Sequence, residues 1–325
     1  MSTATIDETF LAQVEPLRRE LTAHCYRMLG SVHEAEDLVQ ETYLRAWRSF
    51  HGFEQRSSVR TWLYRIATNV CLTALEKNKR RPLPTGLGQP SSDPSGTLDE
   101  RPELPWLEPL PDQLVWGEPA PDPAEQAVTR DNVRLAFVAA LQLLTPKQRA
   151  VFLLREVLAW QASEVAMALD ISVAAVNSAL QRARAQLAAQ PPGQPELPDD
   201  EHARELLDRY LAAFENYDVE QIVALLTEDA VWEMPPFTSW FQGASNIARL
   251  ISEQCPASGP DDMRLVPTSA NGQPAFAVYH RDEQGVYRPF QLQQLTLSGN
   301  RVSHVACYFD ISLFSVFGLP EVLAS

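Results

Sequence analysis

The sequence lacks the features that are typical of disulfide-rich, zinc-binding, membrane and secreted proteins. Its four cysteines, Cys25, Cys71, Cys255 and Cys307, form no Cys-x-x-Cys pair, which argues against a disulfide framework or a structural zinc site. No uninterrupted apolar run approaches the roughly 20 residues that a membrane span needs. The start, MSTATIDETF, lacks the basic and apolar regions of a signal peptide. We therefore expect a cytoplasmic protein without membrane contact, cofactor or metal.

Basic residues are also scarce, with 27 Lys and Arg against 42 Asp and Glu and a formal net charge of −15. This balance argues against nucleic acid as a partner, because Lys and Arg supply the affinity for phosphate. The distribution along the chain changes that conclusion. Residues 129–190 contain seven basic and four acidic residues, whereas residues 191–325 contain seven basic and 19 acidic residues. A DNA-binding surface is expected in the middle of the chain.

A length of 325 residues suits two or three domains. Proline and glycine concentrate in residues 82–123 and again in QPPGQPELPDD at 190–200, and both stretches are typical of linkers. They predict five parts: a helical module at 10–78, a Pro-rich linker at 79–128, a second helical module at 129–190, a short linker at 191–200 and a C-terminal domain at 201–325.

The stretch EAEDLVQETYLRAW, from Glu34 to Trp47, predicts a strong helix in the first module. Ser31 with Glu34 forms a capping box. The core-facing side recurs every three or four residues and consists of Ala35, Leu38, Val39, Thr42 and Ala46. A different side carries Glu34, Asp37 and Glu41, followed by Arg45 and Arg48. This acidic side is either a solvated face or a surface for a partner.

Residues 145–187 predict a helix-turn-helix. Thr145, Pro146 and Gln148 make the start of one helix, a short helix follows from about Ser163 to Leu169, and Ser172 caps a longer one. The outer side of that longer helix offers amides and hydroxyls for base edges and guanidinium groups for phosphates. Its members are Ser172, Asn177, Ser178, Gln181, Arg182 and Arg184. A three-helix bundle with a polar outer face fits the same pattern.

The tail from residue 201 predicts helices followed by strands, which indicates an α+β domain. The strands are expected near Ala230–Met234, Ala275–Arg281, Phe290–Leu297 and Arg301–Phe309. Four residues in it could supply acid or base chemistry: Asp229, Glu233, His304 and Asp310. Their spacing does not place any two of them together. His304 with Cys307 is too small a set for a zinc site.

Several motifs together resemble the extracytoplasmic-function group of bacterial RNA polymerase sigma factors. They are HCYRMLGSVHEAEDLVQETYLRAWRSF, SSVRTWLYRIATNVCLTALEKNKRRPLP and a helix-turn-helix ending VNSALQRARAQL. The linker sequence PWLEPLPD and the tail LAAFENYDVEQIVALLTEDAVWEMPPFTSWFQG resemble the subgroup with a fused domain similar to SnoaL and ketosteroid isomerase. Asn177 and Ala179 depart from the group, in which Lys or Arg is common at these positions.

The resemblance implies a protein that binds the clamp coiled coil and the flap of core RNA polymerase and directs it to promoter DNA. The helix at Glu34–Trp47 would dock on the clamp through Asp37, Gln40 and Glu41, with Arg45 adjoining, since complementary charge speeds and orients docking. The residues after it would hold the melted minus-ten element, because aromatic and guanidinium groups receive unstacked bases. These residues are His51, Phe53, Arg56, Arg60, Trp62, Arg65 and Asn69.

The resemblance also implies roles for the linker and the tail. A promoter spacer of roughly 17 base pairs covers about 58 Å, and a linker of some 50 residues reaches across it as a tether or as an occupant of a polymerase channel. The tail would be a cone-shaped SnoaL/NTF2-like domain around a pocket that takes a small-molecule ligand. Its candidate lining is Trp232, Met234, Trp240, Phe241, Tyr279 and His280.

A regulatory, non-catalytic tail is the preferred interpretation. The alternative is a DNA-binding regulator fused to an isomerase-like or ligand-binding enzyme domain. The first 75 residues discriminate between the two, because a regulator of that kind does not need them, whereas a sigma factor needs both helical modules and a surface for the polymerase.

Overall fold

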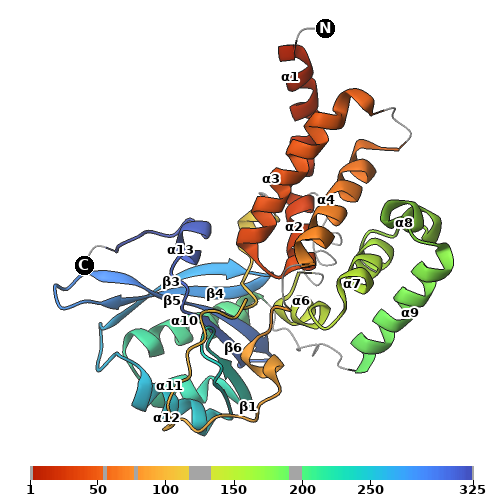
Figure 1. Ribbon diagram of the computed structural model, residues 1–325. Helices are drawn as coiled ribbons and strands as arrows, with labels where there is room; N and C mark the ends of the chain where they lie inside the picture. The colour runs from red at the N-terminus through yellow and green to blue at the C-terminus, as the bar shows by residue number, and fades with distance from the viewer. Residues whose placement is uncertain (1–2, 54–56, 77–79, 117–132, 190–199, 324–325) are drawn as a thin grey trace. The chain divides into compact units, whose positions relative to one another are not determined.

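The computed structural model describes residues 3–53, 57–76, 80–116, 133–189 and 200–323 (Figure 1). These residues fall into two compact units. The helical unit consists of Met1–Arg81 and Leu107–Pro192, and the α+β unit consists of Pro82–Trp106 and Gly193–Ser325. The chain therefore passes between the two units three times. The α+β unit includes a piece of the linker that precedes the helix-turn-helix.

The helical unit contains two modules. The N-terminal module has α1 (Thr3–Val14), η1 (Glu15–Leu17), α2 (Arg18–Leu29), α3 (Val32–Ser49), η2 (Phe50–Gly52) and α4 (Val59–Leu75). The helix-turn-helix module has α6 (Leu135–Leu141), α7 (Pro146–Phe152), the π-helical turn η5 (Leu153–Val157), α8 (Ala162–Leu169) and α9 (Val173–Ala189). The predicted all-α modules are confirmed.

The starts of these helices follow from local chemistry. Ser31 Oγ accepts a hydrogen bond from the Glu34 N–H, and Thr145 and Gln148 form a reciprocal capping box. Ser172 Oγ accepts from the Ala175 N–H at the start of α9. The turn before it begins at Asp170, a non-glycine residue with φ +52° that ends α8. The sequence predicted each of these boundaries.

The α+β unit begins with α10 (Asp200–Glu215) and α11 (Val219–Ala224). The elements that follow are β1 (Leu226–Glu233), β2 (Trp240–Gln242), α12 (Ala244–Gln254), β3 (Met263–Ala270), β4 (Gln273–Arg281), β5 (Tyr287–Ser298), β6 (Arg301–Tyr308) and α13 (Leu313–Val316). The strands form one sheet in the order β2-β1-β6-β5-β4-β3. Only the β1–β6 pair is parallel among these strands.

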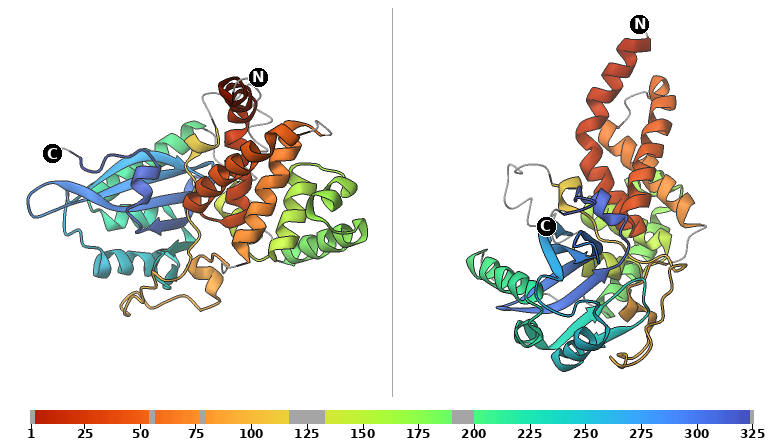
Figure 2. Two further views of the ribbon diagram at one scale, coloured as in Figure 1. Left: turned by 45° about the horizontal axis from the view of Figure 1, so that its top comes forward. Right: turned by 90° about the vertical axis from the view of Figure 1, so that its left-hand side faces the viewer.

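Helices α10, α11 and α12 bury their apolar side chains in one core with the inner face of the sheet (Figure 2). The predicted α+β class is confirmed. Strands β2 and β3 were not predicted. Pro267 interrupts the pattern of β3, and proline is tolerated there because β3 is an edge strand.

The linker falls into two packed pieces. Residues 82–106, which we call the strap, belong to the α+β unit and include η3 (Pro84–Leu87). Residues 107–116, which we call the latch, belong to the helical unit and include η4 (Asp112–Leu114). The sequence left open whether the linker is a tether or occupies a polymerase channel, and in this structure residues 82–116 pack on folded surfaces. Residues 117–128 lie outside the described residues.

Candidate functional sites

The first candidate site is the outer face of α3. Asp37, Gln40 and Arg45 are exposed and Glu41 is half-buried, and Glu41 Oε1 lies 2.6 Å from Arg45 Nε. An exposed ion pair one helical turn apart contributes little to stability, about 0.3–0.5 kcal/mol. The opposite side of α3 is buried and consists of Val32, Ala35, Val39, Thr42 and Ala46. Asp37, Gln40 and Arg45 therefore lie outside the core of the module.

An apolar groove adjoins this acidic face. Its cavity is about 550 Å³ in volume, and the residues that line it from α1 and α3 are Phe10, Leu11, Gln40, Tyr43, Leu44 and Trp47. Leu11, Leu44 and Trp47 are 54, 50 and 45% exposed. The sequence pattern alone did not indicate Leu44 and Trp47 as site residues. They could have been found as large apolar residues outside the buried stripe of an otherwise regular amphipathic helix.

The second candidate site is the start of α4, where the minus-ten contacts were expected. The Arg60 guanidinium is 2.7 Å from Glu20 Oε2 and lies over the ring of Tyr64. The hydrogen bond to Glu20 raises the pKa of Arg60, so this side chain stays charged. Trp62 is half-buried and stacks on Phe53 with ring centroids 4.6 Å apart. Arg56 and the side chain of His51 lie outside the described residues.

Arg65 and Asn69 are exposed further along α4. Asn69 Nδ2 donates to the carbonyl oxygen of Arg65 at 2.8 Å and to that of Ala168 at 3.2 Å. Ala168 belongs to α8, so a residue expected to touch melted DNA is bonded to the helix-turn-helix module. The two modules of the helical unit are in direct contact at this point.

The same contact is built around a buried arginine. Arg149 of α7 donates to the carbonyl oxygen of Met28 at the end of α2, to Gln142 Oε1 at 2.7 Å and to the carbonyl oxygen of Leu144 at 3.3 Å. Burial lowers the pKa of Arg149 to about 10, which still leaves it charged at neutral pH. Tyr64 and Trp160 meet edge to face across the same interface. The N-terminal and helix-turn-helix modules therefore pack as one body.

The third candidate site is the outer side of α9. Asn177, Gln181, Arg182 and Arg184 are exposed and Ser178 is half-buried, whereas Ser172 caps the helix. Arg182 donates to Ser178 Oγ at 2.7 Å, and Arg184 is 2.7 Å from Glu156 Oε1. The buried side consists of Val176, Ala179, Leu180 and Ala183. Ala179 is thus a core residue, so its departure from Lys or Arg leaves the outer side unchanged.

The fourth candidate site is a cavity of about 300 Å³ inside the α+β unit. Leu98 of the strap lines it together with residues of the helices and strands. The other lining residues are Phe214, Trp232, Met234, Phe237, Leu250, Ile251, Gln254, Cys255, Pro256, Met263, Phe290, Gln291, Gln293 and Phe309. The lining carries no charged side chain.

One buried amide faces this cavity without a full set of partners. Gln293 is fully buried, and its Oε1 accepts a hydrogen bond of 2.9 Å from the Tyr210 hydroxyl, whereas its Nε2 has no partner. Burial raises the pKa of Tyr210 well above its ordinary value, so the phenol keeps the proton that it donates. An unpaired buried N–H group costs about 1–3 kcal/mol.

The six residues expected to line the pocket divide into two groups. Trp232 and Met234 line the cavity. Phe241 is in the core, and Tyr279 is buried against Phe314 of α13, with its hydroxyl donating to the Pro320 carbonyl oxygen. Trp240 donates from Nε1 to Gln89 of the strap, and His280 packs beside Phe290.

These four residues lie off the cavity, which corrects the expectation for Trp240, Phe241, Tyr279 and His280. Strand alternation assigns residues to two faces but does not say which face is inward. On β4 the core-facing residues are Phe276 and Val278. Tyr279, one residue further, therefore faces the other way.

The structure brings together two of the four candidate acid–base residues, although not at the cavity. His304 Nε2 lies 2.7 Å from Glu233 Oε1, and Glu233 Oε2 accepts a hydrogen bond of 2.7 Å from the Thr85 N–H of the strap. Glu233 lies on β1 between the cavity-lining residues Trp232 and Met234 and so points to the opposite face. Neither Glu233 nor His304 lines the cavity, and both carboxylate oxygens of Glu233 already have hydrogen-bond partners.

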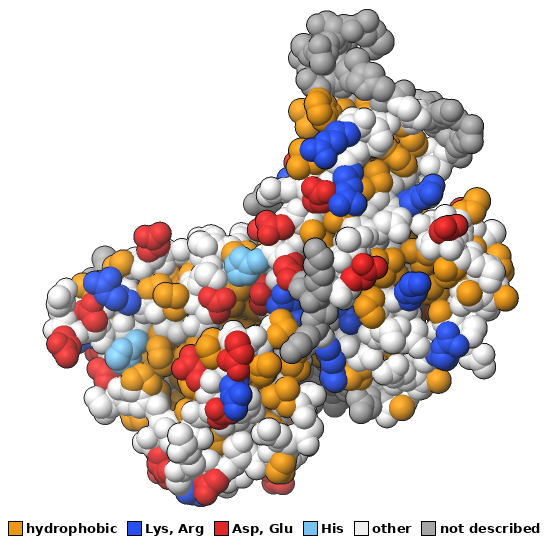
Figure 3. Space-filling model, in the orientation of Figure 1, with side chains coloured by type: hydrophobic (Ala, Val, Ile, Leu, Met, Phe, Trp, Pro, Cys, Tyr) orange, Lys and Arg blue, Asp and Glu red, His pale blue; other side chains and the backbone are white. Residues whose placement is uncertain are grey.

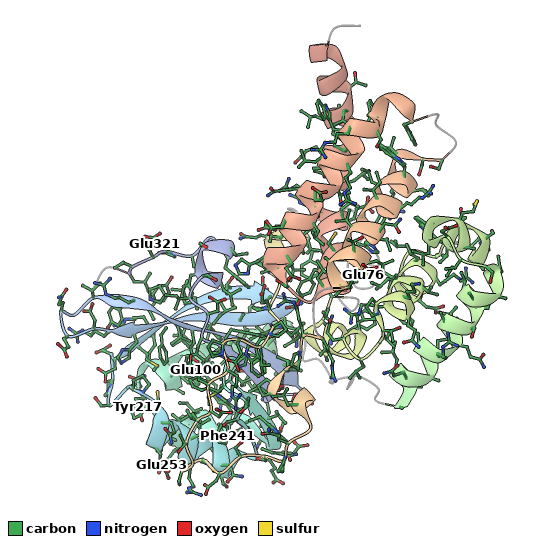
Figure 4. The ribbon with its side chains drawn as sticks, viewed as in Figure 1. Glu76, Glu100, Tyr217, Phe241, Glu253 and Glu321 are labelled. Carbon is green, nitrogen blue, oxygen red and sulfur yellow. The ribbon has the colours of Figure 1, made fainter. Side chains whose placement is uncertain are left out.

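The strap is held to the α+β unit by hydrogen bonds to the edge strand β2 and to the residues just before it. The Ser92 N–H donates to the Trp240 carbonyl oxygen, the Thr238 N–H to that of Asp99, and the Arg101 N–H to that of Pro236. Figure 4 labels Glu100 of the strap and Phe241 of β2. An unpaired edge strand is a site for unwanted pairing, and the strap covers this one.

The latch is held to the N-terminal module by Glu108. Its Oε2 accepts hydrogen bonds from Ser31 Oγ at 2.8 Å and from the Val32 N–H at 2.9 Å, and it lies 3.0 Å from His33 Nδ1. Oε1 is 3.6 Å from Arg81. Burial alone would raise the pKa of Glu108, but these bonds and Arg81 hold it below its usual value. Glu108 thus caps the start of α3.

Gly30 makes room for this contact. It ends α2 with φ +74°, and a Cβ atom there would lie 2.8 Å from Leu107 Cδ1. The Glu108 N–H also donates to the Gly30 carbonyl oxygen at 3.0 Å. The sequence indicated PWLEPLPD as a motif, but it did not predict that Glu108 caps a helix. A lone glutamate between apolar residues and prolines was the available signal.

Two kinds of feature are absent from the part of the chain that the structure describes. No group of three or more His, Cys, Asp or Glu residues with metal-binding geometry occurs there. No single helix in these ranges is long and apolar enough to cross a membrane. Helices α8 and α9 reach that length and composition only together, with a bend of 103° between them.

Comparisons with known proteins match each part of this architecture. Family models match at three places: sigma-70 region 2 at residues 13–81, sigma-70 region 4 at residues 134–187 and a SnoaL-like domain at residues 207–305. The two helical modules and the α+β unit therefore each have a recognised relative.

Similarity to individual proteins spans nearly the whole chain. The ECF RNA polymerase sigma factor SigG of Mycobacterium tuberculosis H37Rv is 59% identical over 317 residues, which cover 97% of this chain and 85% of SigG. SigJ of the same strain is 30% identical over 256 residues, or 77% of this chain and 74% of SigJ. The crystal structure of M. tuberculosis SigJ has the same fold, with a TM-score of 0.61 at 23% identity over 96% of this chain and 99% of that one.

Proposed function

The chain belongs to the extracytoplasmic-function sigma factors of RNA polymerase, and we propose that its α3 face docks on the polymerase clamp while its α+β unit regulates promoter binding without catalysis. As a member of this family, the protein acts with core RNA polymerase and promoter DNA in transcription initiation. We further propose that it works in the cytoplasm, where RNA polymerase meets promoter DNA.

The observation that supports the docking surface is the exposed side of α3. Asp37, Gln40 and Glu41 supply polar and acidic contacts that orient a basic partner. Leu44 and Trp47 supply apolar area in the adjoining groove, and aromatic residues at the centre of an interface contribute most of its binding energy. The helix-turn-helix module then binds the flap of the polymerase and the minus-35 element of the promoter.

The promoter contacts follow from the second and third sites. Phe53, Trp62, Arg60, Arg65 and Asn69 offer rings and cations to the melted minus-ten strand. Arg60 then exchanges Glu20 for a phosphate. On α9, Asn177, Ser178 and Gln181 face base edges while Arg182 and Arg184 face phosphates.

The contact between the two helical modules supports a closed resting state. Helices α8 and α9 contain eight and 17 residues, so even end to end they span about 40 Å at 1.5 Å per residue. With Asn69 bonded to Ala168, the two DNA-binding surfaces are closer than the roughly 58 Å of a 17-base-pair spacer. The modules must separate before both elements can be bound.

A non-catalytic role for the α+β unit is supported by where its acid–base pair lies. Glu233 and His304 face away from the cavity, and the Thr85 N–H of the strap donates a hydrogen bond to the Glu233 carboxylate. The strap makes this unit part of the connection between the modules, which suits regulation. On the face drawn in Figure 3, acidic side chains are frequent over the α+β unit, a charge suited to compete with DNA for basic surfaces.

Run-off transcription tests these assignments. Full-length protein with core polymerase should transcribe from promoters selected out of a random library, and core polymerase alone should not. Absence of any selected promoter would contradict the assignment of promoter recognition. A chain ending near Gln190 should still bind core polymerase and promoter but transcribe with altered strength. Equal transcription by both chains across salt and protein concentrations would contradict regulation by the α+β unit.

A further inference from the structure

The cavity of the α+β unit has the properties of a ligand site rather than of a packing defect. Voids larger than a water molecule are few in protein interiors, because side chains pack at crystal-like density. A volume of about 300 Å³ is at the lower end of the range for small-molecule pockets. Most of its lining is apolar, as in pockets that bind small molecules.

The lining defines the chemistry of the occupant. Five aromatic residues surround the cavity, namely Phe214, Trp232, Phe237, Phe290 and Phe309, and none of the lining side chains is charged. A charged molecule would lose its hydration without compensation. Flat rings, in contrast, would find aromatic faces and edges to pack against. The occupant is therefore neutral, largely apolar and of modest size.

The unpaired amide adds one polar requirement. Gln293 is a lining residue whose Oε1 is held by Tyr210, so its Nε2 is the group left to donate. A carbonyl or ether oxygen on the occupant would satisfy it and recover the cost of leaving it unpaired.

The strap forms one wall of the same cavity. Leu98 lines it directly. Two other lining residues hold the strap: Gln254 Nε2 donates to the carbonyl oxygens of Pro94 and Gly96, and Phe237 pairs with Glu100 in a β-bridge. A molecule in the cavity would thus touch the strap and both of the residues that fix it.

We propose that this cavity binds a small, neutral, mostly apolar molecule with one hydrogen-bond acceptor, and that its occupancy stabilises the docked strap. The strap continues at one end into Arg81 and at the other into the latch, and Arg81 and the latch both belong to the helical unit. The ligand therefore acts on the linker between the two DNA-binding modules. This inference rests on the proposed regulatory role of the α+β unit and names the signal for it.

The neutral fluorophore prodan, a naphthalene with one ketone, is a suitable probe for the full-length protein. We expect saturable binding with blue-shifted emission. Gln293→Leu should weaken binding about tenfold by removing the donor. Leu98→Trp should abolish binding by filling the cavity from an irregular segment, where a larger side chain is tolerated. Thr97→Ala, a change at the exposed neighbouring residue of the strap, should leave affinity unchanged. Thermal unfolding of each variant checks that it is folded.

Hydrogen exchange measures the coupling. Saturating prodan should slow exchange of the Ser92 and Arg101 amides, which bond the strap to Trp240 and Pro236, by about tenfold, since a ligand stabilises the state that it binds. Amides of α7 should not change. Failure to bind, or binding that Gln293→Leu and Leu98→Trp leave intact, would overturn the site. Binding without slower strap exchange would overturn the coupling. Neither result affects transcription by the unliganded protein, which tests the proposed function separately.

Discussion

The helical unit and the α+β unit keep their candidate functional side chains in opposite places. In the helical unit most of them are exposed, on sides of α3, α4 and α9 that face away from the core. In the α+β unit they line an uncharged cavity to which the strap contributes Leu98. The difference predicts how each unit responds to change. Surface substitutions in the helical unit should alter binding and leave folding intact, whereas the interior site couples binding to stability.

The double variant Asp37→Arg with Glu41→Arg is the strongest test of the surface sites in the helical unit. Placing like charges against a basic partner costs several kcal/mol, so affinity for core polymerase should fall at least about 100-fold. Competition against another sigma factor for core polymerase measures this fall. The matched control is Glu201→Arg with Glu205→Arg, two acidic residues at the same spacing on α10. Equal losses for both double variants would show a nonspecific charge effect.

The latch tests the effect of a buried contact within the helical unit, whose other candidate residues lie mostly at the surface. Glu108→Gln removes a carboxylate that is only 18% exposed and that caps α3, and it should lower the free energy of unfolding by about 1–3 kcal/mol. Urea denaturation measures the change. Glu103→Gln, at an exposed carboxylate of the strap, is the control and should have little effect.

The same variant has a defined pH dependence. The folded-state pKa of Glu108 lies below its ordinary value of 4.5. The stabilisation is therefore fully present above pH 4.5 and is lost as the pH falls through the lower folded-state pKa. The stability difference between the parent protein and Glu108→Gln should narrow as the pH falls below about 4.5. A difference that stays constant to the lowest pH at which both proteins fold would contradict the assignment.

Substitution of a buried residue usually lowers stability only, but at the contact that holds the closed state it should also raise promoter affinity. Arg149→Leu removes the cation that reaches the end of α2 and should favour separation of the two helical modules. If only the open form binds both promoter elements, promoter affinity of the holoenzyme should rise about tenfold for each 1.4 kcal/mol by which the closed form is weakened. Small-angle scattering should show a larger radius of gyration. Lys147→Leu, at an exposed residue of the same helix, is the control.

The sequence predicted correctly which sides of the helices are buried, because these follow from helical periodicity. Buried and exposed sides of α3 and α9 follow from residues three and four apart, so Asp37, Gln40 and Gln181 were correctly expected to lie outside the core. Strand alternation has no such polarity, which is why Tyr279 was assigned to the cavity and Gln293 was overlooked.

The linker was unpredictable for a different reason. Residues rich in proline carry little periodic signal, and their structure depends on partners far along the chain. Thr85 bonds Glu233 across 148 positions, and Trp240 bonds Gln89 across 151. Such long-range contacts leave no local pattern in a single sequence. Only the unusual PWLEPLPD stretch indicated that part of the linker is specific.

The smallest expected effects concern the recognition helix, where surface changes should redistribute affinity rather than remove it. Asn177→Ala and Gln181→Ala should each change the preferred base at one or two minus-35 positions, by about 1–3 kcal/mol of discrimination. Arg182→Ala should weaken binding uniformly and reduce its salt dependence, since a phosphate contact carries no sequence information. Promoter libraries selected with each holoenzyme measure both quantities. If the two amide variants select the same upstream motif as the parent, α9 reads DNA through other side chains, and the exposed amides are only its solvated face.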